Sequence, residues 1–173
     1  MKRFATFAVL FLSGSIAAAP AFAGIADWPL PVLVTGKKTL HVYSVSGVGG
    51  AGGGAFGTYF SCTSTDTAAM QVGVEVFGDG GGCASPPGCA PGNDAVATSL
   101  SVGSGATVMF GTCPADGILL TSDLAACFTL GSARILSTSR KLICTAFLAD
   151  RLGTPPRTIV YLTIVKKTTQ KGE

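Results

Sequence analysis

Apolar residues recur at every second position through much of this chain, and this spacing constrains its fold more than any other feature. In one run, Met70, Val72, Val74 and Val76 alternate with residues that are small or polar. A period of two is typical of a β-strand that buries one face. Similar runs predict about eight strands in all, the others at 39–46, 55–62, 95–102, 106–112, 133–138, 141–149 and 158–166.

Turn-forming residues separate these runs. Clusters rich in Gly, Asp, Asn, Ser and Pro stand at 78–82, 92–94, 103–105 and 153–156, and such clusters end strands. Only residues 121–127 are compatible with a helical turn, so crossover helices for an α/β fold are missing. The pattern predicts an all-β fold: an antiparallel, Ig-like or Greek-key β-sandwich of about eight strands, with a barrel as the alternative.

The first 23 residues are typical of a signal peptide. Lys2 and Arg3 precede an uncharged, mostly apolar stretch, and Ala21 and Ala23 place small residues where a signal peptidase cleaves. A membrane anchor is disfavoured because polar residues at 13–15 interrupt the stretch, whereas about 20 apolar residues are needed to span a bilayer. We therefore expect a signal peptide at 1–23, a single β-sandwich domain at 24–165, a flexible basic tail at 166–173, and export to the periplasm or the medium.

Charge and cysteine content limit the partners and the redox environment. The chain has 12 basic and 9 acidic residues, and removal of Lys2 and Arg3 leaves the charges nearly balanced. This balance predicts no binding to nucleic acid and no stable membrane insertion after cleavage. Six cysteines in an exported chain predict three disulfides, and we expect the pairs Cys62–Cys144, Cys83–Cys89 and Cys113–Cys127 among the 15 possible pairings.

The strand phases predict which side chains form the core. Residues 141–149 and 158–166 are apolar on both faces over part of their length, which is typical of central strands. Trp28 lies near the start of the mature chain, where we expect it to hold an extended arm against the domain. The predicted core consists of Leu40, Val42, Val72, Val74, Val76, Leu100, Val108, Phe110, Ile135, Ile143, Phe147, Val160, Leu162 and Ile164.

Glycines at 47–57 contain the spacing G-x-G-x-x-G of dinucleotide-binding loops. Gly47, Gly49 and Gly52 match it, but the motif requires a helix that opens at the third glycine. Residues 55–60 instead have the pattern of a strand. We therefore interpret this segment as a hairpin loop and expect no cofactor.

Candidates for catalysis and metal binding are few. His41 is the single histidine; we expect it on the outer face of a strand and without a catalytic role, because no nucleophile motif accompanies it. One histidine and oxidised cysteines do not form a zinc site, and Asp79 and Asp94 are better explained as turn residues than as calcium ligands. Glu75 and Arg134 are expected to pair if they share a sheet face.

Several segments resemble a group of small exported bacterial proteins of unknown function. The segments are GSARILSTS at 131–139, LICTA at 142–146, Pro155-Pro156, SCT at 61–63 and VGVEVF at 72–77. The resemblance covers most of the mature chain and implies a bacterial cell-envelope setting and a sandwich-like domain, without an activity. The segment from Cys83 to Cys89 departs from the group.

Together these features predict an exported, non-enzymatic protein with a binding or structural role, whose partner is a protein or an envelope component. One alternative is a hydrolase of envelope polymers that uses the carboxylates of Asp66, Asp79 and Asp94, because glycoside hydrolysis needs two carboxyl groups facing each other across a cleft. Another is a small inhibitor or toxin that presents the loop between Cys83 and Cys89.

Overall fold

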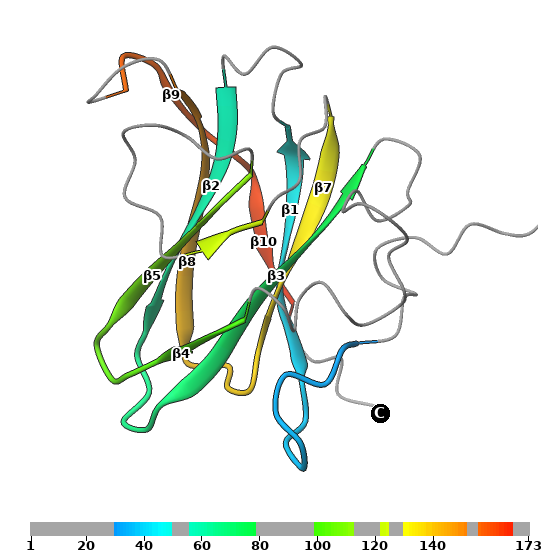
Figure 1. The fold of residues 1–173 in the computed structure, drawn as a ribbon, viewed down its shortest axis with the longest axis vertical. Coiled ribbons are helices and arrows are strands. Elements are labelled where there is room, and N and C mark those ends of the chain that lie inside the picture. Colours follow the sequence, from blue (N-terminus) through cyan, green and yellow to red (C-terminus); the bar gives the residue numbers. More distant parts are fainter. Residues whose placement is uncertain are drawn as a thin grey trace, which may run out of the picture.

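Two five-stranded sheets packed face to face form the fold (Figure 1). The computed structural model describes residues 30–49, 56–78, 99–112, 122–124, 130–151 and 156–167, and none of these residues is helical. The strand order is β10-β1-β7-β3-β4 in one sheet, here sheet A, and β6-β5-β2-β8-β9 in the other, sheet B. The predicted all-β sandwich is confirmed.

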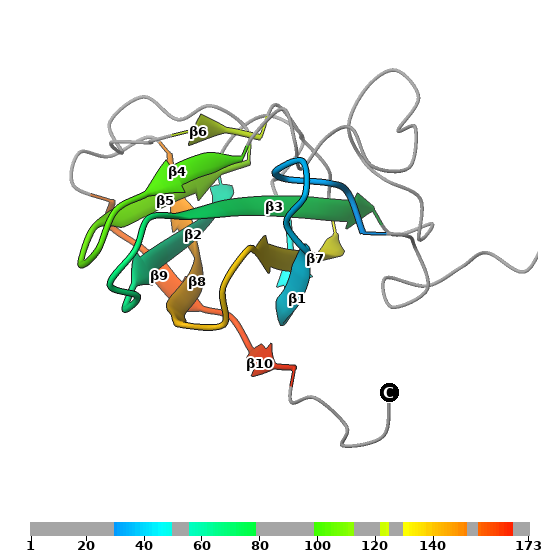
Figure 2. The same ribbon diagram turned by 90° about the horizontal axis from the view of Figure 1, so that it is seen from below.

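Figure 2 shows the two layers from below. Along the chain, β3 and β4, β5 and β6, and β8 and β9 are consecutive strands of one sheet, whereas all other consecutive strands lie in different sheets. All pairs are antiparallel except the two-residue pair β5–β6. The bounds are β1 Leu40–Val48, β2 Phe56–Ser64, β3 Met70–Gly78, β4 Leu100–Val102, β5 Thr107–Gly111, β6 Ser122–Asp123, β7 Gly131–Ser137, β8 Leu142–Asp150, β9 Ile159–Tyr161 and β10 Ile164–Lys166.

Long antiparallel ladders define the centre of each sheet. In sheet B, β2 and β8 pair over nine residues, from Phe56 opposite Asp150 to Ser64 opposite Leu142. In sheet A, β7 lies between β1 and β3 and pairs with both. The β1–β7 ladder has a bulge at Gly47, whose φ of 75° suits a glycine, and this extra residue shifts the register before Val48.

The inner faces of the two sheets form the core. Seven of the predicted core residues are buried, and Leu40, Leu100, Leu162 and Ile164 are partly buried against them. The predicted core residues Ile143 and Val160 are instead 60% and 53% exposed, and Phe147 is only half-buried. The phase of β8 was wrong because this strand is apolar on both faces; Leu142, Cys144 and Ala146 are the residues that point inward.

Residues 158–166 do not form a central strand. They divide into β9, at the edge of sheet B, and β10, at the edge of sheet A. The chain crosses between the sheets at Leu162 and Thr163, where Leu162 N donates to Ala146 O and Thr163 O accepts from Ser46 N. Lys166 belongs to β10, and Lys167 N donates to Val42 O at 2.8 Å, so the sheet extends past the expected domain end at 165.

Two local predictions are corrected. Residues 122–123, expected in a helical turn, form β6 beside β5, and Leu124 N donates to Gly111 O at 2.8 Å. The expected hairpin loop after β1 connects two sheets instead, because β1 and β2 lie in different layers. The Thr58 hydroxyl holds this connection by donating to Gly49 O at 2.7 Å.

Several predictions lie outside the described residues. These are the signal peptide at 1–23, Trp28, Gly52, Asp79, Asp94, the tail from 168 onward and the pairs Cys83–Cys89 and Cys113–Cys127.

Candidate functional site

The disulfide Cys62–Cys144 joins directly opposite residues of β2 and β8. Both cysteines are buried and belong to the core between the sheets. The predicted pairing of these two residues is confirmed. The bond lies within sheet B, whereas in antibody domains the conserved disulfide joins the two sheets. Because both sulfur atoms are buried in the core, this disulfide is a structural link and offers no accessible thiol chemistry.

A buried ion pair links β3 and β7 in sheet A. Glu75 and Arg134 occupy opposite positions in the ladder, and Arg134 Nε donates to Glu75 Oε2. Arg134 is 1% exposed, and its guanidinium lies 5.4 Å from the centre of the Phe77 ring. The expected pairing on a shared face is confirmed. A charge buried to this degree is tolerated because it has both an ionic and an aromatic partner.

This ion pair lies on the face of sheet A that points away from the core. Strand β3 contributes Val72, Val74 and Val76 to the core, so the alternate residue Glu75 points to the other side. Leu33, from the segment before β1, covers part of this outer face by packing against Leu136. Glu75, the only carboxylate on this face among the described residues, is therefore buried and poorly accessible to a substrate.

His41 lies on β1, where it is partly buried. Its Nε2 is 3.0 Å from Ser44 Oγ and 3.1 Å from Tyr43 O. Burial, followed by the positive charges of Lys167 and Arg134, lowers the pKa of His41 to about 4. The imidazole is therefore neutral at pH 7. In the described part of the chain no carboxylate is bonded to it, so the orienting acid of a Ser-His-Asp triad is not seen.

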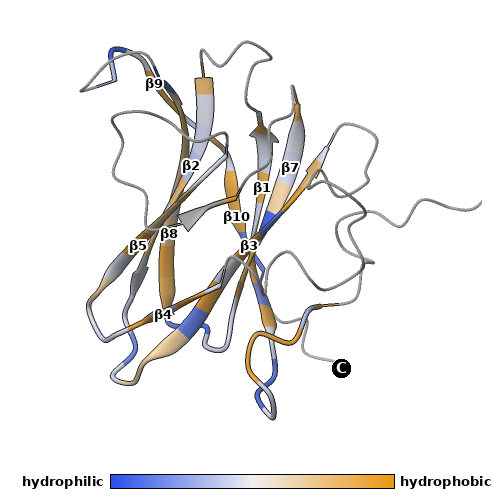
Figure 3. Ribbon diagram, in the orientation of Figure 1, coloured by the Kyte–Doolittle hydropathy of each residue, from blue (hydrophilic) through white to orange (hydrophobic). Residues whose placement is uncertain are grey.

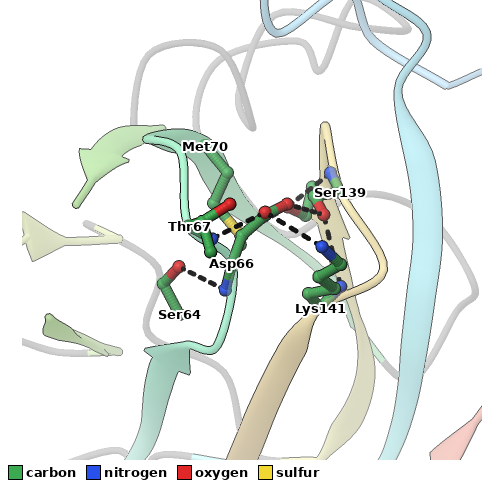
Figure 4. A network of polar contacts seen from close by, with 7 residues as sticks. Ser64, Asp66, Thr67, Met70, Ser139 and Lys141 are labelled. Atoms are coloured by element: carbon green, nitrogen blue, oxygen red, sulfur yellow. Dashed lines mark hydrogen bonds and ion pairs between the residues drawn. The ribbon is translucent and has the colours of Figure 1, made fainter. Parts of the chain in front are cut away.

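Asp66 connects the β2–β3 turn to the β7–β8 turn (Figure 4). Its carboxylate accepts hydrogen bonds from Ser139 Oγ at 2.6 Å and from Thr67 N at 2.8 Å, and Lys141 Nζ lies 3.3 Å away. The Ser139 hydrogen bond, assisted by Lys141 and by backbone N–H groups, lowers the pKa of Asp66 to about 2. A general acid in glycoside hydrolysis needs a raised pKa, so this carboxylate is suited to fixing two turns.

An aromatic row crosses the outer face of sheet B and was not predicted. The Tyr59 and Phe147 rings stack with centroids 5.5 Å apart, and Phe147 meets Tyr161 edge-on at 6.2 Å. Tyr161 is 75% exposed. The three residues come from β2, β8 and β9, and only the strand register places them side by side. The sequence signal would have been aromatic residues at matching phases of three strands.

The Tyr59 hydroxyl is buried and forms no hydrogen bond with any residue that the structure describes. Burial raises the pKa of Tyr59. A side chain on residue 57 would approach this hydroxyl, because a Cβ built on Gly57 lies 3.1 Å from it and 2.8 Å from Thr112 O. Because Gly57 has no side chain, it leaves room for the Tyr59 side chain.

The described segments contain neither a cluster of metal ligands nor a helix that could span a membrane. No group of three or more His, Cys, Asp or Glu side chains there is placed to hold a metal ion. No helix in that part of the chain is long and apolar enough to cross a membrane.

Comparison with known proteins adds no relative. No protein-family model matches this chain, and no curated protein or solved structure matches it either.

Proposed function

We propose that this chain is an exported, non-enzymatic protein with an Ig-like β-sandwich domain that binds, or fills a structural role at, the bacterial cell envelope. In this proposal residues 1–23 are a signal peptide, and the mature protein begins at Gly24. The disulfide Cys62–Cys144 supports export, because disulfides persist in oxidising compartments and are rare in the cytosol.

The non-enzymatic part of the proposal rests on one observation: the ionisable side chains discussed above are held in structural contacts. Glu75 is buried against Arg134, Asp66 is bound by Ser139 and Lys141, and His41 is neutral and partly buried. Catalytic acids and bases usually have a pKa moved toward the working pH. The pKa values of Asp66 and His41 move away from neutrality instead, which favours a binding or structural role over a hydrolase.

Export is tested by producing the full chain in a bacterial host and determining the mass of the recovered protein. We expect the product outside the cytoplasm, with Gly24 as its first residue and Cys62 disulfide-bonded to Cys144. Recovery of the uncleaved chain from the cytoplasm, with reduced cysteines, would contradict the proposal.

The role is tested by mixing the recovered protein with a purified envelope preparation. We expect the protein to sediment with the envelope without releasing soluble fragments, and Asp66→Asn to change neither result. Fragment release that Asp66→Asn abolishes would support the hydrolase alternative. Protein that stays wholly in the supernatant would contradict an envelope role.

A further inference from the structure

Six exposed cationic side chains occur where β1 begins, where β7 turns into β8 and where β10 ends. We call this region the basic end; its residues are Lys37, Lys38, Arg140, Lys141, Lys166 and Lys167. In the hydropathy view, the part of the loop nearest β1 and the β7–β8 turn contain hydrophilic residues and lie at the same end of the sandwich (Figure 3). The sequence distributes these residues over three separate segments, so their common location is a result of the fold.

Backbone contacts join the three segments. Leu40 is paired with Ser137, which places the loop before β1 beside the β7–β8 turn. Lys167 N donates to Val42 O at 2.8 Å, which brings the end of β10 to the same part of β1. Arg140 Nη1 donates to Lys167 O at 3.3 Å and so connects the turn to β10. The three segments that carry the cations therefore lie next to one another at this end of the sandwich.

Few carboxylates oppose this charge within the described residues. Asp66 is the only one at the basic end, and it is already bonded to Ser139 and Lys141. Glu75 is buried with Arg134 on the outer face of sheet A, Asp123 belongs to β6 opposite Gly111, and Asp150 lies at the opposite end of β8. Among the described residues, the basic end therefore has a local excess of positive charge.

The chemistry of the basic end suits a polyanion better than a small anion. Five of the six residues are lysines, which act as point charges on flexible stems, whereas bidentate recognition of a single phosphate favours arginine. The cations also continue from the end of the sandwich onto the edge strand β10, where Lys166 Nζ lies 5.9 Å from the centre of the Tyr43 ring. A flexible polymer can follow such a path, whereas a flat membrane would contact only part of it.

We propose that the basic end binds a linear, phosphate-bearing polymer of the cell envelope. This inference rests on the proposed envelope role and names the chemical class of the partner. Binding releases the counterions condensed on the polymer, so affinity falls as salt rises, with a slope set by the number of phosphates neutralised. Carbohydrate chains without charge offer no such gain and are not expected to bind.

The test uses long-chain inorganic polyphosphate as the probe and the mature protein recovered from the host. The double variant Lys37→Gln/Lys38→Gln removes two cations that have no ion-pair partner among the described residues. We expect its affinity at low salt to fall about tenfold, and the slope of log affinity against log salt to decrease by about 1.4, because each phosphate neutralised on a single-stranded polyanion contributes about 0.7.

A matched control removes two cations at the opposite end, with Arg151→Gln/Arg157→Gln, and is expected to change the affinity less than twofold. A second variant, Lys166→Gln/Lys167→Gln, is expected to behave like the first. Thermal unfolding of each variant checks that the fold is retained. Equal losses in the control and the two test variants would contradict the assignment to the basic end.

Two further results would overturn the proposal. One is the absence of polyphosphate binding at low salt, and the other is binding of phosphatidylglycerol vesicles but not polyphosphate, which would assign the basic end to a membrane surface. Sedimentation with the envelope is measured separately. Protein that sediments with envelope but does not bind polyphosphate would contradict only this inference, whereas protein that does neither would contradict the proposed envelope role as well.

Discussion

Each sheet contains one strong link between directly opposite residues on long strands, but the two links differ in chemistry and in the face on which they lie. In sheet B, Cys62–Cys144 is covalent and faces the core. In sheet A, Glu75–Arg134 is ionic and lies on the outer face. A disulfide is apolar and can be buried among valines and phenylalanines, whereas charges need polar or aromatic partners to offset desolvation.

The two links also stabilise the protein in different ways. A disulfide mainly restricts the unfolded chain, and its effect grows with the length of the loop that it closes. A buried ion pair contributes little net stability, but it makes the loss of either partner costly. We therefore predict that replacing both linked residues destabilises the protein in sheet B, where the link is the disulfide, but is tolerated in sheet A, where it is the ion pair.

The largest expected effect is the loss of the disulfide. Cys62→Ala/Cys144→Ala should lower the free energy of unfolding by about 4.5 kcal/mol, the value expected for a loop with a sequence separation of 82. Urea denaturation of the variant measures this loss. The control is the Cys62→Ala single variant, which breaks the same bond and should lose a similar amount. A loss below about 1 kcal/mol in the double variant would show that the disulfide constrains the unfolded chain less than proposed.

The next largest effect is expected from breaking the ion pair on one side. Arg134→Met removes the ion-pair partner of the buried Glu75 carboxylate and should cost about 3–5 kcal/mol. The double variant Glu75→Leu/Arg134→Met removes both charges and should recover most of that loss. Urea denaturation of the two variants in parallel gives the difference. If the double variant is as unstable as Arg134→Met, the cost arises from lost packing of Arg134 against Phe77 rather than from the lost ion pair.

A smaller difference in stability is expected between Phe variants of two buried tyrosines, one from each sheet. The Tyr43 hydroxyl of β1 donates to Leu142 O of β8 at 2.5 Å and so joins the sheets. Tyr43→Phe should therefore destabilise the protein by about 1 kcal/mol. The Tyr59 hydroxyl of β2 forms no hydrogen bond to a described residue, so Tyr59→Phe should leave stability unchanged or raise it by up to about 1 kcal/mol. Thermal and urea unfolding of both variants would compare them; equal losses would imply a partner for Tyr59.

The strands were predictable where only one face is apolar. The run at 70–76 was correctly located as a strand, with Val72, Val74 and Val76 inward, because alternation identifies the buried face. In β8 both faces carry apolar residues, so the phase could not be determined, and Ile143 was wrongly assigned to the core. The disulfide determines the phase of β8. Since Cys144 faces Cys62 in the core, the neighbouring residue Ile143 must point away from the core.

The candidate sites were less predictable than the strands. Asp66 was singled out as a carboxylate, but its bonds to Ser139 and Lys141 depend on two turns that are more than 70 positions apart. The aromatic row of Tyr59, Phe147 and Tyr161 likewise depends on register. The basic end was missed because net charge averages over the chain, whereas electrostatic attraction depends on which charges lie together.

The sequence by itself determined the elements of this protein: an alternating pattern that can bury only one face of a strand, glycine-rich breaks between the strands, and two cysteines placed to link an early strand to a late one. Only the tertiary structure decided the division of these strands between two sheets, the separation of residues 158–166 into two edge strands and the gathering of six cations at one end. Alternation is a local property of a strand, whereas sheet membership and register are set by which strands meet across the core.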